Sequence, residues 1–401
     1  MQQPKPILWT KDFIIVSAMN FFFTLIFFLL MVTIAVYAVD EFQASTSEAG
    51  LVSGIFIIGV LLGRLGAGRF IEQVGTKRLL LMGIICFGIT TLLYFGINSL
   101  SFLLVNRLLH GVSFGIVSTA TGTIVAQIIP NSRRGEGVGF YSLSVSLATA
   151  IGPFVGMYLR VNANFPTIFA ICFGLVLISF FTSFFLRAPQ VSLTKEQMKE
   201  MSGFKLSNFV EPRAVPIAFV IMLAGFCYSS VLSFLTFYTM EINLVQSASF
   251  FFLVYAIVVL FSRPFTGKWL DTKGPNIIVY PTLTLFAIGM FILSQAHHGI
   301  ILLLAGAIIG LGFGNFQSSA QALAVKLAPP HRVGLATSTF FIFMDIGFGI
   351  GPYILGFLIP ITGYRGLYAA MGIIVAFTII LYYFLYGKKA HETKPDVSAH
   401  A

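Results

Sequence analysis

The sequence has very little charge for its length. Of its 401 residues only 9% are charged, whereas 57% are hydrophobic and the mean hydropathy is +0.93. A soluble domain carries roughly 25% charged residues, because water must wet its surface. The shortage of charge therefore excludes a soluble enzyme, a nucleic-acid-binding domain and a secreted disulfide scaffold. It leaves an integral membrane protein that crosses the bilayer many times.

Cysteine and tryptophan are scarce as well. The chain has 3 Cys and 2 Trp, against 44 Phe. The cysteines lie singly inside apolar runs, with no spacing that suits a metal ion or a disulfide framework. A phosphate-binding loop is missing too, since the glycine-rich run 310–314 lies in an apolar segment without a following Lys-Ser/Thr pair. We therefore expect no metal, no cofactor and no enzymatic activity, and we expect an ion gradient to supply the energy for any transport.

Twelve apolar stretches are long enough to cross a membrane as helices, which requires about 20 largely apolar residues each. They cover approximately residues 13–38, 50–68, 79–97, 101–127, 138–160, 165–187, 214–239, 248–267, 277–296, 299–326, 334–358 and 364–387. The short connections leave no room for a large soluble domain. The sequence therefore predicts an all-α integral membrane protein with twelve transmembrane helices.

The basic residues are concentrated on one side of the predicted membrane. With the N-terminus in the cytoplasm, only Arg107, Arg160 and Arg365 of the 24 Lys and Arg lie in the outer half or outside. The positive-inside rule describes this distribution. The net charge of +10 thus marks the inner face, and contact with anionic lipid follows from it. We expect a bacterial cell-membrane protein with both termini in the cytoplasm and no nucleic-acid partner.

The longest polar stretch divides the chain into two halves. A cytoplasmic linker at 188–213 separates an N-terminal six-helix bundle at 1–187 from a C-terminal six-helix bundle at 214–387. The linker is expected to contain a short amphipathic helix at about 193–201. Residues 388–401 form a polar cytoplasmic tail.

The two halves repeat each other at a constant offset of 199 residues. The matches fall on glycine, proline and charged residues: Arg64, Gly68, Glu72 and Gly75 match Arg263, Gly267, Asp271 and Gly274, and the tripeptide 151–153 matches 350–352. Two six-helix units in the same orientation imply a two-fold axis along the membrane normal. We therefore expect two pseudo-symmetric bundles, with a cavity between them that opens to each side in turn.

The loop between the second and third spans carries a recognisable motif. From Gly68 to Arg78 it reads GRFIEQVGTKR. This resembles the G-x-x-x-D-R-x-G-x-R/K-R/K loop motif of the major facilitator superfamily, with Glu72 and Gln73 in place of the usual Asp and Arg. The resemblance covers about residues 10–390 and implies the major facilitator fold.

Two further motifs narrow the resemblance. The fourth span carries Arg107 and His110 in the run NRLLHG, similar to the arginine-containing motif of the drug:proton antiporter branch. The fifth span contains Gly152-Pro153-x-x-Gly156, which resembles part of the antiporter motif G-x-x-x-G-P-x-x-G-G. Together these favour the twelve-helix efflux branch.

We interpret the loop motif as a conformational latch. Glu72 can accept hydrogen bonds from the N-terminus of a neighbouring helix or pair with an arginine, which would hold the halves together at the inner face. The alternative is a solvated loop with charges that only set topology. The candidate latch residues are Gly68, Arg69, Glu72, Gly75, Lys77, Arg78, Arg263, Gly267, Lys268 and Asp271.

A second conformational element is predicted where proline interrupts the fifth and eleventh spans. Proline bends a helix and an adjacent glycine permits close packing, so the pair can shape the cavity; a simple packing kink is the alternative. The residues are Gly152, Pro153, Gly156, Gly351 and Pro352.

Ionisable residues inside the spans are the candidates for proton coupling, because such groups are costly in a membrane unless they are paired or face water. Asp345 is the only acid near the middle of a span. It could exchange a proton in step with conformation, bind a cationic group or form a structural hydrogen bond. Arg107 could bind substrate, serve a proton-carrying partner or form a structural ion pair, and His110 could titrate or simply pack. Many drug:proton antiporters carry an acid in the first helix, whereas this chain has none there at mid-membrane depth.

Polar residues of spans one, four, seven and ten are the candidates for contact with substrate. These are Asn20, Arg107, Tyr228, Asn315, Gln317 and Gln321. Asn315 and Gln321 are six residues apart, so at most one of them is expected to face the cavity. A largely aromatic cavity with few charges suits amphipathic organic molecules better than sugars or inorganic anions.

These features predict a proton-coupled exporter of small organic compounds, working as a monomer. A drug is one candidate cargo and a siderophore or metallophore is another, since Arg107 could meet its carboxylates. The alternatives are a proton-coupled nutrient importer and, less favoured because no soluble domain is appended, a non-transporting membrane receptor.

Overall fold

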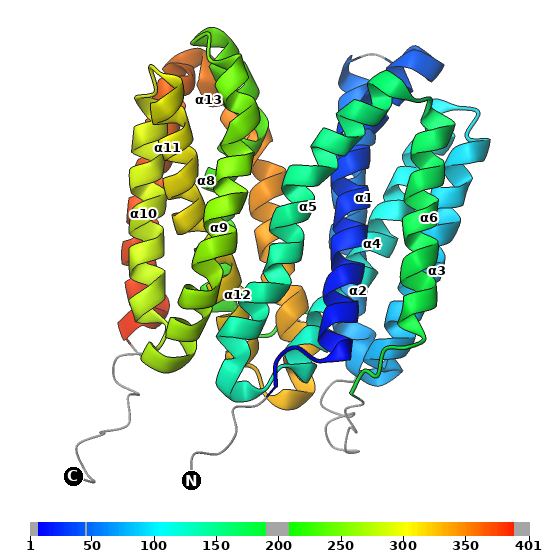
Figure 1. The fold of residues 1–401 in the computed structure, drawn as a ribbon, viewed down its shortest axis with the longest axis horizontal. Coiled ribbons are helices and arrows are strands. Elements are labelled where there is room, and N and C mark those ends of the chain that lie inside the picture. Colours follow the sequence, from blue (N-terminus) through cyan, green and yellow to red (C-terminus); the bar gives the residue numbers. More distant parts are fainter. Residues whose placement is uncertain (1–6, 45, 190–207, 389–401) are drawn as a thin grey trace.

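The computed structural model describes residues 7–44, 46–189 and 208–388. Over these residues the chain forms helices joined by short connections (Figure 1). Within these residues, twelve continuous helical segments are long and apolar enough to cross a membrane. This confirms the predicted number of spans, whereas the amphipathic helix predicted at 193–201 lies outside the described residues.

The first half of the chain forms one bundle of six helices. These are α1 (Lys11–Phe42), α2 (Thr46–Val74), α3 (Thr76–Leu93), α4 (Leu100–Ile128), α5 (Arg134–Asn162) and α6 (Phe165–Ser183), with short 3₁₀ turns at Tyr94–Gly96 and Asn131–Arg133. Polar caps fix several of the starts: Thr10, Ser99 and Asn164 each accept a hydrogen bond from the backbone N–H three residues on.

The second half forms the other bundle. Its helices are α8 (Val215–Glu241), α9 (Val245–Lys273), α10 (Asn276–Ser294), α11 (Gly299–Ile309), α12 (Asn315–Leu327) and α13 (Val333–Tyr382). The glycine-rich run Gly310–Gly314 is a π-helical stretch between α11 and α12, and a second π-helical stretch at Tyr383–Gly387 follows α13. A short 3₁₀ turn at Pro330–Arg332 precedes α13.

The range labelled α13 contains the last two predicted spans. The backbone leaves the helical conformation within it at Gly363, whose φ is +64°. Glycine adopts this left-handed conformation without steric strain, so the chain can turn back there with almost no loop. The predicted spans 334–358 and 364–387 are therefore two separate helices, with Gly363 between them.

Each bundle has its own hydrophobic core. Phe23, Phe87 and Tyr94 belong to the first core, and Phe286 and Phe313 belong to the second. Large apolar side chains also cover the outside, for example Phe154 at 71% and Phe261 at 70% exposure. Exposed apolar surface of this extent is expected for helix faces that meet lipid. Packing therefore stabilises each bundle separately, and the surface between the bundles is free to change.

The two bundles meet near the end of the molecule where both termini lie (Figure 1). We call this end the base, and it holds Val74, Arg134, Lys273 and Val333. The helices that pack across the two halves are α2 and α4 against α13, and α5 against α9 and α12. Most of the residues that join the halves are therefore found on these six helices.

Candidate functional site

Two acidic side chains at the base cap helices of the opposite half. Glu72 Oε1 accepts a hydrogen bond of 2.7 Å from the backbone N–H of Gly334, in the first turn of α13. Asp271 accepts bonds of 2.8 and 3.1 Å from the N–H groups of Gly135 and Glu136, in the first turn of α5. The first turn of a helix has unpaired N–H groups and a partial positive charge, which suit a carboxylate. These are contacts of the kind that the loop motif led us to expect.

Glycines let the helices approach closely beside these contacts. A Cβ atom on Gly68 would collide with the side chain of Ser338, and one on Gly267 would collide with the backbone of Gly135 and Glu136. Gly68 and Gly267 are equivalent under the 199-residue repeat. The same close contact is thus built twice, once from each half.

The other predicted latch residues do different things. Gly75 has a φ of +93° and precedes α3, a conformation that favours glycine. Lys77 Nζ donates a hydrogen bond of 2.7 Å to the Leu186 carbonyl within the first half. The Arg69 guanidinium lies 5.8 Å from the ring of Phe209. Arg78 and Lys268 are exposed at the base.

A buried ion pair joins the halves above the glycine contacts. Arg64 Nε of α2 lies 2.7 Å from Asp345 Oδ2 of α13, and the side chains are only 5% and 12% exposed. The Arg64 guanidinium also lies 4.4 Å from the centre of the Phe341 ring. The backbone carbonyl of Arg64 accepts a hydrogen bond of 2.6 Å from Ser338 Oγ. A buried pair of this kind is strongly destabilised when one partner loses its charge.

Arg64 was not among the predicted site residues. Its position ten residues before the end of α2 places it inside the predicted span, which is the signal that could have identified it. The structure pairs Asp345 with Arg64 and separates it from Arg107, the other intramembrane arginine singled out from the sequence.

Arg263 occupies the equivalent place in the second half. It is 1% exposed, and it donates hydrogen bonds across the boundary to the Gly139 carbonyl at 3.0 Å and to Ser146 Oγ at 3.4 Å. A third bond, of 2.9 Å, goes to the Gly314 carbonyl in its own half. Ser146 lies 199 residues before Asp345, so the second arginine meets a serine where the first meets an acid.

Arg107 and His110 lie together inside the first half. Arg107 donates to the Val52 carbonyl at 3.1 Å and to the Tyr94 hydroxyl at 3.3 Å. His110 Nδ1 lies 3.0 Å from the same hydroxyl, and each of the two side chains is 1% exposed. Arg107 therefore sits at a helix interface, one of the two placements expected for it, and it does not reach the second half.

Three of the predicted substrate-contacting residues are engaged within their own bundle. Asn20 Nδ2 donates to Ser144 Oγ at 2.7 Å, and Asn315 Nδ2 donates to Ser262 Oγ at 2.8 Å. The Tyr228 ring stacks on the Phe313 ring, with centroids 4.2 Å apart. Each of these contacts fastens helices of one half to each other.

Gln321 contacts the other half, whereas Gln317 contacts α13 of its own half. Gln321 Oε1 accepts a bond of 3.4 Å from Ser142 Oγ of α5, across the boundary. Gln317 Nε2 lies 3.3 Å from the sulfur of Met344, one residue before Asp345. Gln321 and Asn315 thus differ in what they face, as their six-residue spacing requires.

The glycine–proline motifs lie within the halves. Gly152 and Gly156 of α5 contact α1, and Gly351 of α13 contacts α8. Pro153 and Pro352 lie inside α5 and α13. These residues bring together helices of the same bundle, at equivalent places in each half.

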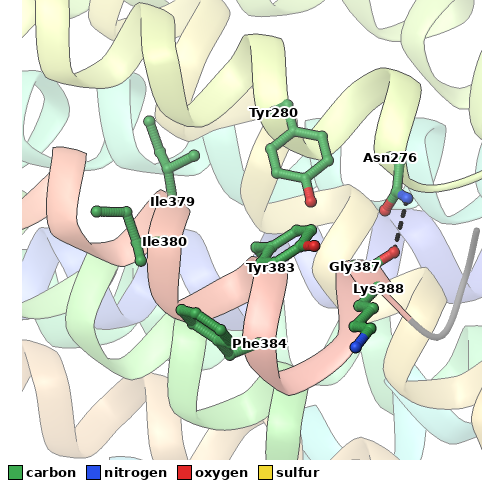
Figure 2. Close-up of a pocket in the computed structure, with 8 residues that line it drawn as sticks. All are labelled: Asn276, Tyr280, Ile379, Ile380, Tyr383, Phe384, Gly387 and Lys388. Carbon is green, nitrogen blue, oxygen red and sulfur yellow. Dashed lines mark hydrogen bonds between the residues drawn. The ribbon is translucent and has the colours of Figure 1, made fainter.

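Two hollows lie at the base, away from these residues. One, of about 700 Å³, is lined by Asn276, Tyr280, Tyr383 and Lys388, among others (Figure 2). The other, of about 470 Å³, is lined by Lys11, Lys77, Phe184, Phe185 and Arg187, among others. Neither contains a residue of the predicted proton or substrate sets, and the second includes the predicted latch residue Lys77.

Within the ranges that the structure describes, no three His, Cys, Asp or Glu side chains are placed to hold a metal ion. The three cysteines, Cys86, Cys172 and Cys227, are free thiols.

Comparison with known proteins gives one family and a consistent set of relatives. The family model for the Major Facilitator Superfamily matches residues 16–345 and 245–401. The staphylopine export protein of Staphylococcus aureus is 24% identical over 354 residues, which cover 85% of this chain and 88% of that protein. Multidrug resistance protein 1 of Bacillus subtilis is 25% identical over 345 residues, which cover 83% of this chain and 86% of that protein.

A solved structure supports the same fold. The chain is similar to the crystal structure of the transporter FucP in the outward conformation, with a TM-score of 0.75 and 16% identity. The match covers 94% of this chain and 99% of that one. At this identity the likeness supports the architecture of two six-helix bundles.

Proposed function

The chain belongs to the major facilitator superfamily, as a transporter of small molecules, and we propose that it exports amphipathic organic compounds in exchange for protons. Alternating access between two pseudo-symmetric bundles would carry the cargo across. Multidrug and metabolite exporters among the relatives support efflux. The observation on which the proton coupling rests is the Arg64–Asp345 ion pair.

We propose that the base faces the cytoplasm of a bacterial cell. Arg78, Arg134, Lys273 and Lys388 all lie at the base, as expected for the side that retains positive charge. With the halves joined at the base, cargo would be released on the opposite side. The structure would then correspond to the outward-facing stage of the cycle.

Asp345 is the proposed proton carrier. When it is ionised, it pairs with Arg64 across the boundary and helps to hold the base closed. A proton that reaches Asp345 from outside neutralises the carboxylate and removes this attraction. The Arg64 guanidinium then loses its counter-charge, and separation of the halves at the base lets it reach water.

The return step carries the cargo. Once the base is open, Asp345 releases its proton to the cytoplasm and the cargo enters between the halves. Re-formation of the Arg64–Asp345 pair closes the base around the cargo. One inward proton is thereby linked to one closing of the base, which is the coupling that antiport needs.

Gln317 and Gln321 are the proposed polar contacts of the cargo. Gln321 bonds to α5 across the boundary, and Gln317 contacts Met344, the neighbour of Asp345. Asn20, Tyr228 and Asn315 are engaged within their bundles and would set the shape of the wall. Arg107 and His110 form a second candidate proton site, since they share a buried hydroxyl inside the first half.

The transporter is proposed to act as a monomer surrounded by lipid. The hollow lined by Lys11, Lys77 and Arg187 combines three cations with two exposed phenylalanines at the base. That composition suits the headgroups of anionic lipids.

One alternative cargo is favoured by a specific observation. A relative of 24% identity is named as the staphylopine export protein. The cargo of this chain could therefore be a metal-chelating metabolite, a siderophore or metallophore, in place of a drug.

Proton movement in inverted vesicles tests the proposal. With an acidified lumen, adding an exported compound outside should raise the lumenal pH, and vesicles without the protein should show no such rise. Accumulation of the compound without proton movement would contradict the coupling. Proton and compound moving in the same direction would instead identify an importer.

A further inference from the structure

Arg263 is a buried charge without an acid beside it. Within the described part of the chain it forms no ion pair, and its partners are the Gly139 and Gly314 carbonyls and Ser146 Oγ. Its Nε has no hydrogen-bond partner although the side chain is 1% exposed. A buried guanidinium in this position retains the capacity to bind an anion.

Opening of the base would remove most of what holds Arg263 now. Two of its three acceptors, Gly139 and Ser146, belong to α5 of the opposite half and would move away. Only the Gly314 carbonyl belongs to its own half. The open state would therefore leave a guanidinium with several free N–H donors at the boundary.

Polar groups beside Arg263 would complete a site. Ser262 and Thr266 lie on the same helix, and Asn315 bridges them by hydrogen bonds of 2.8 and 3.0 Å. These groups lie in the second half and would stay with Arg263 when the base opens. Arg107 also lacks an acid partner in the described chain, but its contacts are within the first half and would not be uncovered.

We infer that Arg263 binds a carboxylate of the cargo when the base is open, so that the cargo class is amphipathic organic anions. The planar guanidinium fork suits bidentate binding of a carboxylate. This rests on the proposed efflux function and adds the charge of the cargo to it. The anion would take the place of the Gly139 and Ser146 acceptors at the moment when these are lost.

Two dyes built on one xanthene ring system test the inference in inverted vesicles. Fluorescein carries a carboxylate, whereas rhodamine 6G is a cationic ester. In Arg263→Gln, transport of fluorescein should fall by roughly 10- to 100-fold, the effect of losing a hydrogen bond to a charged group. Transport of rhodamine 6G should fall by a clearly smaller factor, because this dye loses only the bonds of Arg263 across the boundary and no anion contact.

Position 146 supplies a second variant that keeps the arginine. Ser146→Asp places an acid where the first half has Asp345, and it should occupy Arg263 and reduce fluorescein transport to a similar extent. Ser146→Asn has nearly the same side-chain size without the charge, and it should transport fluorescein like the wild type.

Several results would overturn the inference. These are wild-type transport of fluorescein by both Arg263→Gln and Ser146→Asp, equal loss of both dyes, or a wild type that carries only rhodamine 6G. A wild type that carries neither dye would count against the efflux of amphipathic compounds itself.

Discussion

The two halves of the molecule build the same contact with different chemistry. Arg64 and Arg263 are equivalent under the repeat, and both reach across the boundary from the second helix of their half. Arg64 meets the carboxylate of Asp345, whereas Arg263 meets the hydroxyl of Ser146. A proton can neutralise only the first of these contacts. The repeat therefore supplies a symmetric scaffold in which only one of these two contacts contains a carboxylate.

The contacts nearer the base show what symmetry preserves. Glu72 and Asp271 each cap the helix of the opposite half, at Gly334 and Gly135. These contacts depend on backbone N–H groups, which every helix start provides. These caps fix how the two halves meet. In the proposed mechanism, the residue that faces each arginine, at position 146 or 345, then determines whether a proton can break that contact.

The largest effect is expected from Asp345→Asn. Losing one member of a buried ion pair destabilises a protein by about 3–5 kcal/mol, because the other charge stays buried. Transport driven by a proton gradient should fall more than about tenfold, while exchange of labelled for unlabelled cargo persists. The double variant Arg64→Gln/Asp345→Asn should recover stability without recovering gradient-driven transport. Gradient-driven transport at the wild-type rate in Asp345→Asn would show that coupling lies elsewhere.

Exchanging the residues at positions 146 and 345 should move the proton-sensitive contact from Arg64 to Arg263. In Asp345→Ser/Ser146→Asp the acid pairs with Arg263, so gradient-driven transport of rhodamine 6G, which carries no carboxylate for Arg263 to bind, should return to within about tenfold of the wild type. Asp345→Ser alone is the control and should stay inactive in the same assay. Equal activity of the single and double variants would mean that the two arginine sites are not functionally equivalent.

Smaller effects are expected from the helix caps. Each cap hydrogen bond to a charged group contributes about 1.5–3 kcal/mol. Asp271→Asn should open the base more than Glu72→Gln, because Asp271 accepts two N–H bonds and Glu72 accepts one. Spin labels at the exposed, equivalent positions Arg78 and Ile277 would report the separation of the halves. The opposite ranking would contradict the hydrogen bonds described here.

The smallest effect is expected from His110→Gln. His110 lies inside the first half, where its ring shares the Tyr94 hydroxyl with Arg107 and does not reach the boundary. Glutamine can keep a hydrogen bond, so transport should change by less than about threefold. Loss of the pH dependence of transport in this variant would show that the proton binds at the Arg107–His110 pair and not at Asp345.

The helices and the repeat could be predicted because they depend on local signals. Apolar runs gave the spans, and rare residues at a fixed spacing, such as Gly68 and Gly267, gave the two halves. The break between the last two spans was predicted as well, since the spans 334–358 and 364–387 lie on either side of Gly363, where the backbone leaves the helical conformation.

The partners across the boundary could be predicted only in part. The motif suggested that Glu72 meets a helix N-terminus, and a span was predicted to begin at Gly334, but nothing in the chain showed that the two meet. Asp345 was conspicuous as an acid within a span, yet its partner Arg64 was not identified. Helices that are apolar on all sides give no sign of which face meets which neighbour. Arg107 illustrates the same limit. Its position within the membrane could be predicted, whereas the helices that its side chain contacts could not.

The separation of the halves at the base, measured as a function of pH, tests most directly whether Asp345 is the switch. Spin labels at positions 78 and 277 would be compared between the wild type and Asp345→Asn. In the wild type, acidification should protonate Asp345, break its pair with Arg64 and lengthen the distance between the labels. The variant should show the longer distance at every pH. A wild-type distance that does not change with pH, or a variant that follows the same pH profile as the wild type, would contradict the assignment of the switch to this ion pair.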